Sequence, residues 1–245
     1  MAVGNNAAAQ WRAIEDLHQL VSSTVRAPVE VSPETVQSFQ VDGVVLLREA
    51  FPDWVEPLRA GLQRNLETPE AFAFPCDSVG DDEDGRFFDS YCNWQLIPEY
   101  LDFVLTSQAA AIAAQLMKST TAQLFHDHAF VKERGTAKAT PWHHDLPYYC
   151  VDGTQTVSIY VALDRTPIET GVRFLKGSHH NGDVYRPRDF ASGAEYDNED
   201  RSLVPVPDVD PDAANIFVEV LNPGDAVCFD FRTLHGKTSA KIENR

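Results

Sequence analysis

The stretch Thr140-Pro141-Trp142-His143-His144-Asp145-Leu146-Pro147-Tyr148-Tyr149 sets an imidazole and a carboxylate two residues apart in a run of strand-forming aromatic residues. In a strand, residues i and i+2 point to the same face, so we expect His143 and Asp145 to converge on one ion and His144 to face away. A third ligand, His235, lies 92 residues after His143 (235 − 143). Two histidines and one carboxylate leave coordination positions open on non-haem Fe(II), the arrangement that suits oxygenase chemistry. The sequence therefore predicts His143, Asp145 and His235 as the metal ligands and catalytic centre.

Composition indicates one globular domain over residues 1–245. The chain is 43% hydrophobic and carries a net charge of −17, which disfavours nucleic acid as a partner because its phosphates would be repelled. No apolar run approaches the ~18 residues that span a bilayer, and residues 1–10 have neither the basic nor the apolar part of a signal peptide. The four cysteines form no CxxC pair, which favours reduced thiols. We expect a cytoplasmic protein without a membrane partner, whose oligomeric state the sequence does not indicate.

The pattern along the chain predicts helices first and strands afterwards. Residues 1–121 are expected to form a mostly helical buttress with one leading strand, and residues 122–245 the β core, giving a mainly β fold with flanking helices. Ser32 is expected to cap a helix in which Pro33 takes the first position. The predicted helices are 7–25, a short one after Pro33, 51–66 and 97–117, and the predicted strands are 43–48, 123–132, 142–149, 154–164, 171–176, 216–220 and 226–231.

Four motifs occur in the order of a known family: residues 124–133, 140–149, 171–179 and 230–236. From about Phe39 to Arg245 the chain resembles a bacterial-type member of the phytanoyl-CoA dioxygenase family, whose members are Fe(II)/2-oxoglutarate-dependent oxygenases. The resemblance implies a double-stranded β-helix, a jelly-roll or cupin-like barrel. Family members continue through a final barrel strand, so we expect that strand to be missing from a chain that ends at Arg245.

The resemblance also implies a reaction and its cofactors. These are Fe(II), 2-oxoglutarate as co-substrate and O2, used to hydroxylate a small organic molecule while 2-oxoglutarate is converted to succinate and CO2. The carboxylate tail of 2-oxoglutarate calls for an arginine, and Arg245 stands at the family position ten residues beyond His235. Thr140, Tyr160 and His128 occupy positions where the family makes further contacts with the co-substrate.

Residues 178–215 form a long interval rich in Gly, Pro and Asp, which is typical of an active-site cover or of a surface insertion. His126 and His128 flank Asp127, and we interpret them as lining the pocket, because the family has no distant ligand to complete a second metal site.

Two other classes of function stay open. A cupin-like metal protein would use the same barrel for different chemistry, although its usual His-x-His cluster differs from His143-x-Asp145. A non-catalytic barrel would act as a binding module, and an intact ligand triad opposes that. Halogenation is disfavoured because Asp145 fills the position where a halogenase needs a small residue. The sequence names neither the substrate nor an acyl-CoA.

Overall fold

The computed structural model describes residues 29–68, 87–132, 140–188, 194–196 and 202–237. The predicted helix over residues 7–25 lies outside these ranges. The helices are α2 (Pro33–Asp42), η1 (Pro52–Trp54), α3 (Val55–Glu67), α4 (Pro98–Thr106), α5 (Ala109–Leu116), η3 (Leu146–Tyr148), η4 (Ile168–Thr170) and η5 (Ser178–His180). The strands are β1 (Val44–Leu47), β2 (Phe87–Tyr91), β3 (His128–Lys132), β4 (Thr140–His143), β5 (Ser158–Val161), β6 (Arg173–Leu175), β7 (Ile216–Phe217), β8 (Ala226–Phe229) and β9 (His235–Lys237).

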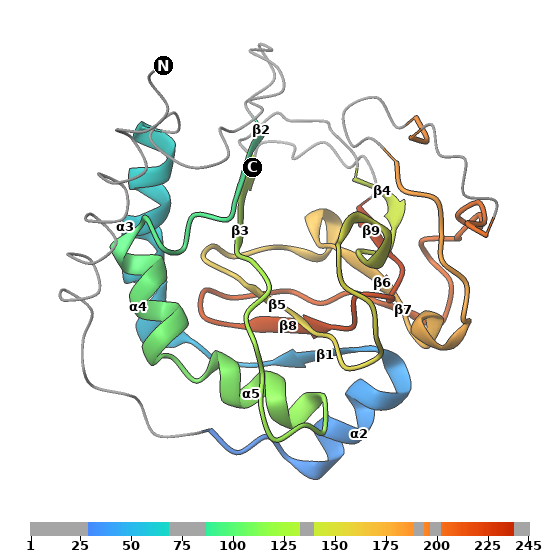
Figure 1. The fold of residues 1–245 in the computed structure, drawn as a ribbon, viewed down its shortest axis with the longest axis horizontal. Coiled ribbons are helices and arrows are strands. Elements are labelled where there is room, and N and C mark those ends of the chain that lie inside the picture. The colour runs from blue at the N-terminus through green and yellow to red at the C-terminus, as the bar shows by residue number, and fades with distance from the viewer. Residues whose placement is uncertain (1–28, 69–86, 133–139, 189–193, 197–201, 238–245) are drawn as a thin grey trace, which may run out of the picture.

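The strands form three antiparallel sheets, with the orders β1-β8-β5, β2-β3 and β4-β9-β6-β7. Helices α2 to α5 lie along one side of the first sheet, and β4, β9, β6 and β7 lie beyond its other side (Figure 1). The expectation of a mainly β fold with flanking helices is confirmed. Within the described residues the sheets do not close into a barrel.

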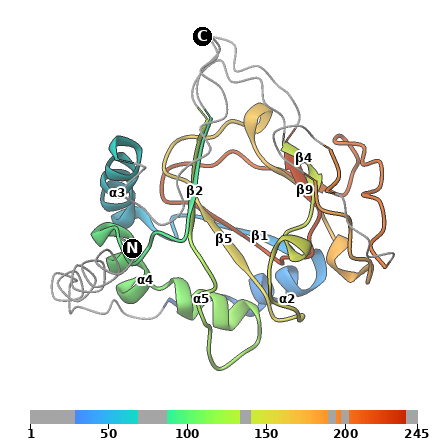
Figure 2. The same ribbon diagram turned by 45° about the horizontal axis from the view of Figure 1, so that its top comes forward.

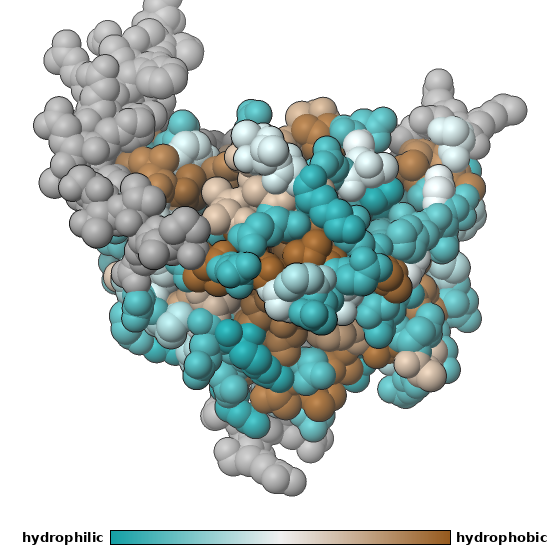
Figure 3. Space-filling model, turned by 90° about the horizontal axis from the view of Figure 1, so that it is seen from below, coloured by the Kyte–Doolittle hydropathy of each residue, from teal (hydrophilic) through white to brown (hydrophobic). Residues whose placement is uncertain are grey.

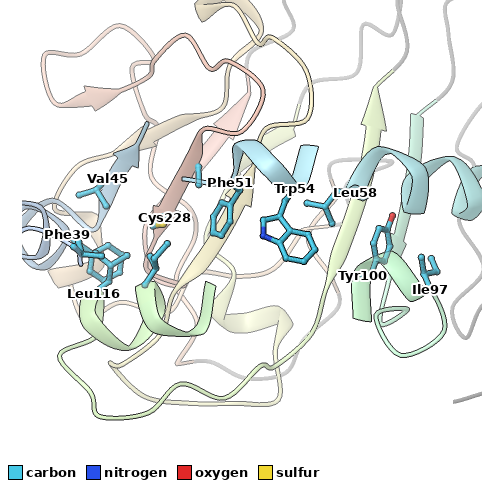
Figure 4. Close-up of a cluster of buried hydrophobic side chains, with 12 residues drawn as sticks. Phe39, Val45, Phe51, Trp54, Leu58, Ile97, Tyr100, Leu116 and Cys228 are labelled. Carbon is cyan, nitrogen blue, oxygen red and sulfur yellow. The ribbon is translucent and has the colours of Figure 1, made fainter. Parts of the chain in front are cut away.

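The first sheet separates two hydrophobic clusters. Along β8, Ala226 and Cys228 pack toward the helices, whereas Val227 and Phe229 pack toward the four-stranded sheet. This alternation is the period-2 rule for a strand covered on both faces. Figure 4 shows the helix-side cluster, in which Phe51 and Trp54 lie between the sheet and the helices.

Local signals at the start of α2 act as predicted. The Ser32 side chain accepts a hydrogen bond from the Thr35 N–H at 3.2 Å, and Pro33 takes the first helical position. The helix ends at Gly43, whose φ of 74° is left-handed. A side chain there would overlap His179 and Thr233, so only glycine fits this junction between α2 and β1.

The single helix predicted over residues 97–117 is wrong. It is divided into α4 and α5, and Ser107 between them has extended backbone angles (φ −76°, ψ 171°). Helix α4 packs against α3, whereas α5 packs against α2. One straight helix could not pack against both α3 and α2, so tertiary packing overrides the helix propensity of the Ala-rich sequence.

Several strand boundaries also differ from the prediction. The strand expected over residues 123–132 begins only at His128, and the one expected over 142–149 ends at His143, where the chain turns into η3. Strands β2 and β9 were not predicted. Each is three to five residues long, too short for an alternating pattern to identify.

No helix among the described residues is both long and apolar enough to cross a membrane. Seen from the side on which α2 and α5 lie, the surface mixes hydrophilic side chains with smaller apolar areas between them (Figure 3).

Candidate metal centre

The three predicted ligands meet at the end of the four-stranded sheet. His143 closes β4 and His235 opens β9, and these two residues lie directly opposite each other in the antiparallel register. Oδ1 of Asp145 lies 3.7 Å from Nε2 of His143 and 3.5 Å from Nε2 of His235. One donor atom from each residue lies within 4.8 Å of the others, so a single ion can contact all three.

Asp145 is positioned by a backbone conformation and by hydrogen bonds that the sequence did not predict. It lies beyond the end of β4 in a helical conformation (φ −75°, ψ −29°), so the argument from alternation along a strand is wrong for this residue. Its N–H donates to the Phe231 carbonyl at 2.8 Å, and the Leu146 N–H donates to the same oxygen at 3.1 Å. Because Phe231 lies in the connection between β8 and β9, that connection positions both Asp145 and His235.

Backbone carbonyls fix the proton positions of both histidines. Nδ1 of His143 lies 2.9 Å from the Pro141 oxygen, and Nδ1 of His235 lies 2.9 Å from the Thr233 oxygen. A carbonyl only accepts, so each Nδ1 carries the hydrogen and each Nε2 presents a lone pair to the centre. Burial, followed by the neighbouring His235, lowers the pKa of His143 well below its ordinary value. Both effects favour the neutral imidazole that a metal requires.

The carboxylate of Asp145 is held on its far side. Ser158 donates its hydroxyl hydrogen to Oδ2 at 3.3 Å. Burial raises the pKa of Tyr149, and the charge of Asp145 together with a hydrogen bond to it raises that pKa further. Tyr149 therefore stays a phenol that donates to Asp145, and these contacts leave Oδ1 directed toward the two imidazoles.

His144 faces away from the centre, as expected. Its Nε2 accepts a hydrogen bond from the Tyr185 N–H at 3.0 Å, and its ring packs on that of Tyr185. The residue is only 1% exposed, and burial lowers the pKa of its imidazole to about 4. It joins the metal-bearing loop to the segment that follows η5.

The residues predicted to contact the co-substrate differ from one another in their surroundings. Thr140 begins β4, three residues before His143, and its Oγ1 accepts a hydrogen bond from Nζ of Lys132 at 2.9 Å. Tyr160 faces the cluster between the sheets and stacks on Phe130. His128 is hydrogen-bonded to Asp89, and its side chain is 43% exposed. Arg245 lies outside the described residues.

Two lysines near the centre were not singled out from the sequence. Lys132 shares a face of β3 with His128 and Phe130, and Lys237 shares a face of β9 with His235. Lys237 is the register partner of Thr140, and burial lowers the pKa of its ammonium group. The alternation of residues along β3 places Lys132 on the same face as His128. It does not indicate that Lys132 contacts Thr140, because Thr140 belongs to another strand.

A separate hollow of about 420 Å³ lies elsewhere on the molecule, and none of the three predicted ligands lines it. Its walls include Gln40, Lys118, His179 and Arg232. Asp230 in its wall is already paired with Arg232 at 2.8 Å, and among the described residues the triad is the group that brings three donors together, so we do not assign a metal to this hollow.

Comparison with known proteins identifies a family and a shared fold. The chain matches the family described as phytanoyl-CoA dioxygenase over residues 39–239, while no curated protein sequence matches it. The solved structure of the non-haem α-ketoglutarate-dependent carbocyclase SnoK from nogalamycin biosynthesis is 23% identical. Its TM-score is 0.64, and the match covers 87% of this chain and 81% of that one.

Two further solved structures have the same fold. EvdO2 from Micromonospora carbonacea var. aurantiaca, complexed with 2-oxoglutarate, is 22% identical with a TM-score of 0.62 over 89% of each chain. EctD from S. alaskensis is 18% identical with a TM-score of 0.61 over 89% of this chain and 76% of that one. The family match and the donor set agree with the expected cofactors, which are Fe(II), 2-oxoglutarate and O2.

Proposed function

Because the chain belongs to the phytanoyl-CoA dioxygenase family, we propose that it is an Fe(II)/2-oxoglutarate-dependent oxygenase that hydroxylates a small organic molecule. The observation that carries the proposal is the convergence of His143, Asp145 and His235. The proposal includes one oxygenase domain over residues 1–245, built on a double-stranded β-helix. Residues 1–121 would buttress a core over residues 122–245.

Three of the protein's own groups would hold the ion. The two Nε2 atoms and Oδ1 of Asp145 supply three protein donors, and a site with three protein donors keeps positions for a bidentate 2-oxo acid and O2. When bound, these cofactors supply the oxidising power, as 2-oxoglutarate is decarboxylated to succinate and a substrate C–H bond is oxidised. His143 and His235 are 6% and 8% exposed, so the protein side of the site excludes water.

The defining test is anaerobic absorption spectroscopy. Addition of Fe(II) and then 2-oxoglutarate should produce the weak visible charge-transfer band of the bidentate chelate. Tight Fe(II) binding without such a band would contradict the proposal and favour a cupin-like metal protein. The fold also occurs in an α-ketoglutarate-dependent carbocyclase and an epimerase, so mass spectrometry of the product must show the addition of one oxygen atom.

We further propose that Lys132, with Thr140, contacts the carboxylate tail of 2-oxoglutarate. The Lys132 ammonium has three donor hydrogens. It donates a hydrogen bond to Thr140, which belongs to β4, the strand that carries His143. A hydrogen bond to a charged group contributes about 1.5–3 kcal/mol. The variant Lys132→Met should therefore bind 2-oxoglutarate roughly 10- to 150-fold more weakly in an anaerobic calorimetric titration.

Fe(II) affinity should stay unchanged in this variant, because Lys132 contacts the tail and not the ion. Lys118→Met is the matched control, since Lys118 is exposed in the turn after α5. If both variants bind 2-oxoglutarate like the parent, Lys132 is not part of the co-substrate site.

We also propose that residues 178–215 cover the site. The Tyr148 hydroxyl accepts from the Arg188 N–H at 2.7 Å and donates to the Arg188 carbonyl at 3.0 Å, and Tyr185 is bonded to His144. The described part of this interval is thus joined to the loop that bears Asp145. Arg186 and Arg188 both lie beside Glu195, within the interval itself.

Ligand binding should order the loop that bears Asp145, and with it residues 178–215. Limited proteolysis within these residues should therefore slow when Fe(II) and 2-oxoglutarate are present without oxygen. Mapping the cleavage sites by mass spectrometry measures this. Cleavage at an unchanged rate under saturating ligands would identify the interval as a surface insertion.

A further inference from the structure

Ring contacts run without a break from the loop that bears Asp145 onto strand β3. The Tyr149 ring lies 4.9 Å from that of His126, which stacks on His128 at 6.5 Å, and His128 contacts Phe130 at 5.7 Å. Two more rings flank this series: Phe125 lies 5.0 Å from Tyr149, and Tyr91 lies 5.6 Å from His128. We call these six residues the aromatic strip: Tyr91, Phe125, His126, His128, Phe130 and Tyr149.

Three rings of the strip are partly exposed at the surface. Tyr91 is 42% exposed, Phe125 is 39% exposed and Phe130 is 37% exposed. Large apolar groups gathered on a surface mark a binding site more often than isolated ones do. Strands β2 and β3, which carry Tyr91 and Phe130, stand between the helices and the β4–β9 end of the molecule (Figures 1 and 2).

One end of the strip touches the metal centre. Tyr149 hydrogen-bonds to Asp145, and the Tyr149 ring contacts that of His126. A ligand lying on these rings would therefore lie next to one of the three donors. This position beside the metal centre favours a substrate over a docking protein as the occupant of the strip.

The charges within the strip favour an uncharged ligand. Of the carboxylates beside the strip, Asp89 is hydrogen-bonded to His128 and Asp145 belongs to the proposed metal centre, so neither is free to attract a cation. Burial and then the neighbouring His128 lower the pKa of His126, which therefore offers a neutral imidazole with one donor and one acceptor. Neutral rings and a neutral imidazole suit a flat ring that bears a hydroxyl or carbonyl oxygen.

We infer that the aromatic strip binds the flat, unsaturated ring of an uncharged substrate, with a ring oxygen at His126. This inference rests on the proposed oxygenase function, for which it names the class of substrate. Stacking would hold the ring in place while the neighbouring metal centre oxidises a C–H bond attached to it.

The test measures the binding of three probes to the anaerobic protein loaded with Fe(II) and 2-oxoglutarate. The probes are 2-naphthol, its saturated analogue decahydro-2-naphthol, and the cation phenyltrimethylammonium. The perturbation of the visible charge-transfer band gives each dissociation constant. 2-Naphthol should bind at least about 10-fold more tightly than either of the others, because stacking with several rings adds to apolar burial.

Variants then locate the binding surface. Phe125→Leu and Phe130→Leu keep an apolar side chain but remove the ring, so each should weaken 2-naphthol binding roughly 2- to 12-fold. Leu105→Ala is the control, because Leu105 is 49% exposed on α4.

Equal affinities for 2-naphthol and decahydro-2-naphthol would overturn the inference, as would tighter binding of the cation or unchanged binding by both Phe variants. A normal charge-transfer band with no response to any probe would overturn this inference but would not contradict the proposed function. Absence of the band from the parent protein would instead contradict the proposed function.

Discussion

Replacing His143, Asp145 or His235 by alanine should abolish high-affinity Fe(II) binding. Each residue supplies one of the three donor atoms that lie within 4.8 Å of one another, and two remaining donors would hold the ion far more weakly. Oxygen-free calorimetry with Fe(II) measures the loss directly. Activity would disappear with the metal, so the binding measurement is the one that assigns the ligands.

The neighbouring His144 provides the sharpest control. His144→Ala should leave Fe(II) affinity nearly unchanged, because its Nε2 is bonded to the Tyr185 N–H. It should lower the free energy of unfolding, since the residue is buried, and a second control, exposed His180→Ala, should alter neither quantity. Equal loss of Fe(II) in the His144 and His143 variants would show that the ligand set is wrong.

The variant Phe51→Ala should lower the free energy of unfolding by about 3–5 kcal/mol, as is typical when a buried phenylalanine is truncated. Phe51 is 0% exposed and lies edge-on to Phe103 of α4, with ring centroids 5.2 Å apart. Its N–H also donates to the Gly224 carbonyl at 2.8 Å, so it fixes the helical layer against the turn before β8. Urea unfolding of the metal-free protein measures the change.

Val41→Ala serves as the control for this core prediction. Val41 lies on α2 and is 52% exposed, so its truncation should change the free energy of unfolding by no more than about 0.5 kcal/mol. Similar effects for the two variants would show that Phe51 does not join the helices to the sheet.

Features that depend on neighbouring residues in sequence were predictable. Ser32 and Pro33 fix the start of α2 through contacts within a few residues. His143 and His235 were also predictable, although they are far apart in sequence, because their residue types and motifs specify a metal centre. The structure brings them together by pairing β4 directly with β9.

Features that depend on distant partners were not predictable. Asp145 is placed by the carbonyl of Phe231, which no pattern in the segment around Asp145 indicates. The break between α4 and α5 follows from packing on two different helices. His126 and His128 were interpreted from the sequence as lining the pocket, but Lys132 and the rest of the aromatic strip were identified only by contacts between strands, such as that of Phe130 with Tyr160.

Strand β8 makes the molecule unusually intolerant of insertions and deletions at one place. All four of its residues are buried, and the strand pairs with β1 on one side and β5 on the other. Shifting it by a single residue would exchange Val227 and Phe229 with Ala226 and Cys228, placing large side chains where small ones fit and the reverse. The same shift would displace Phe231, which anchors Asp145. An insertion or deletion of one residue in this strand would therefore disturb both hydrophobic clusters and the spacing of the metal ligands at once.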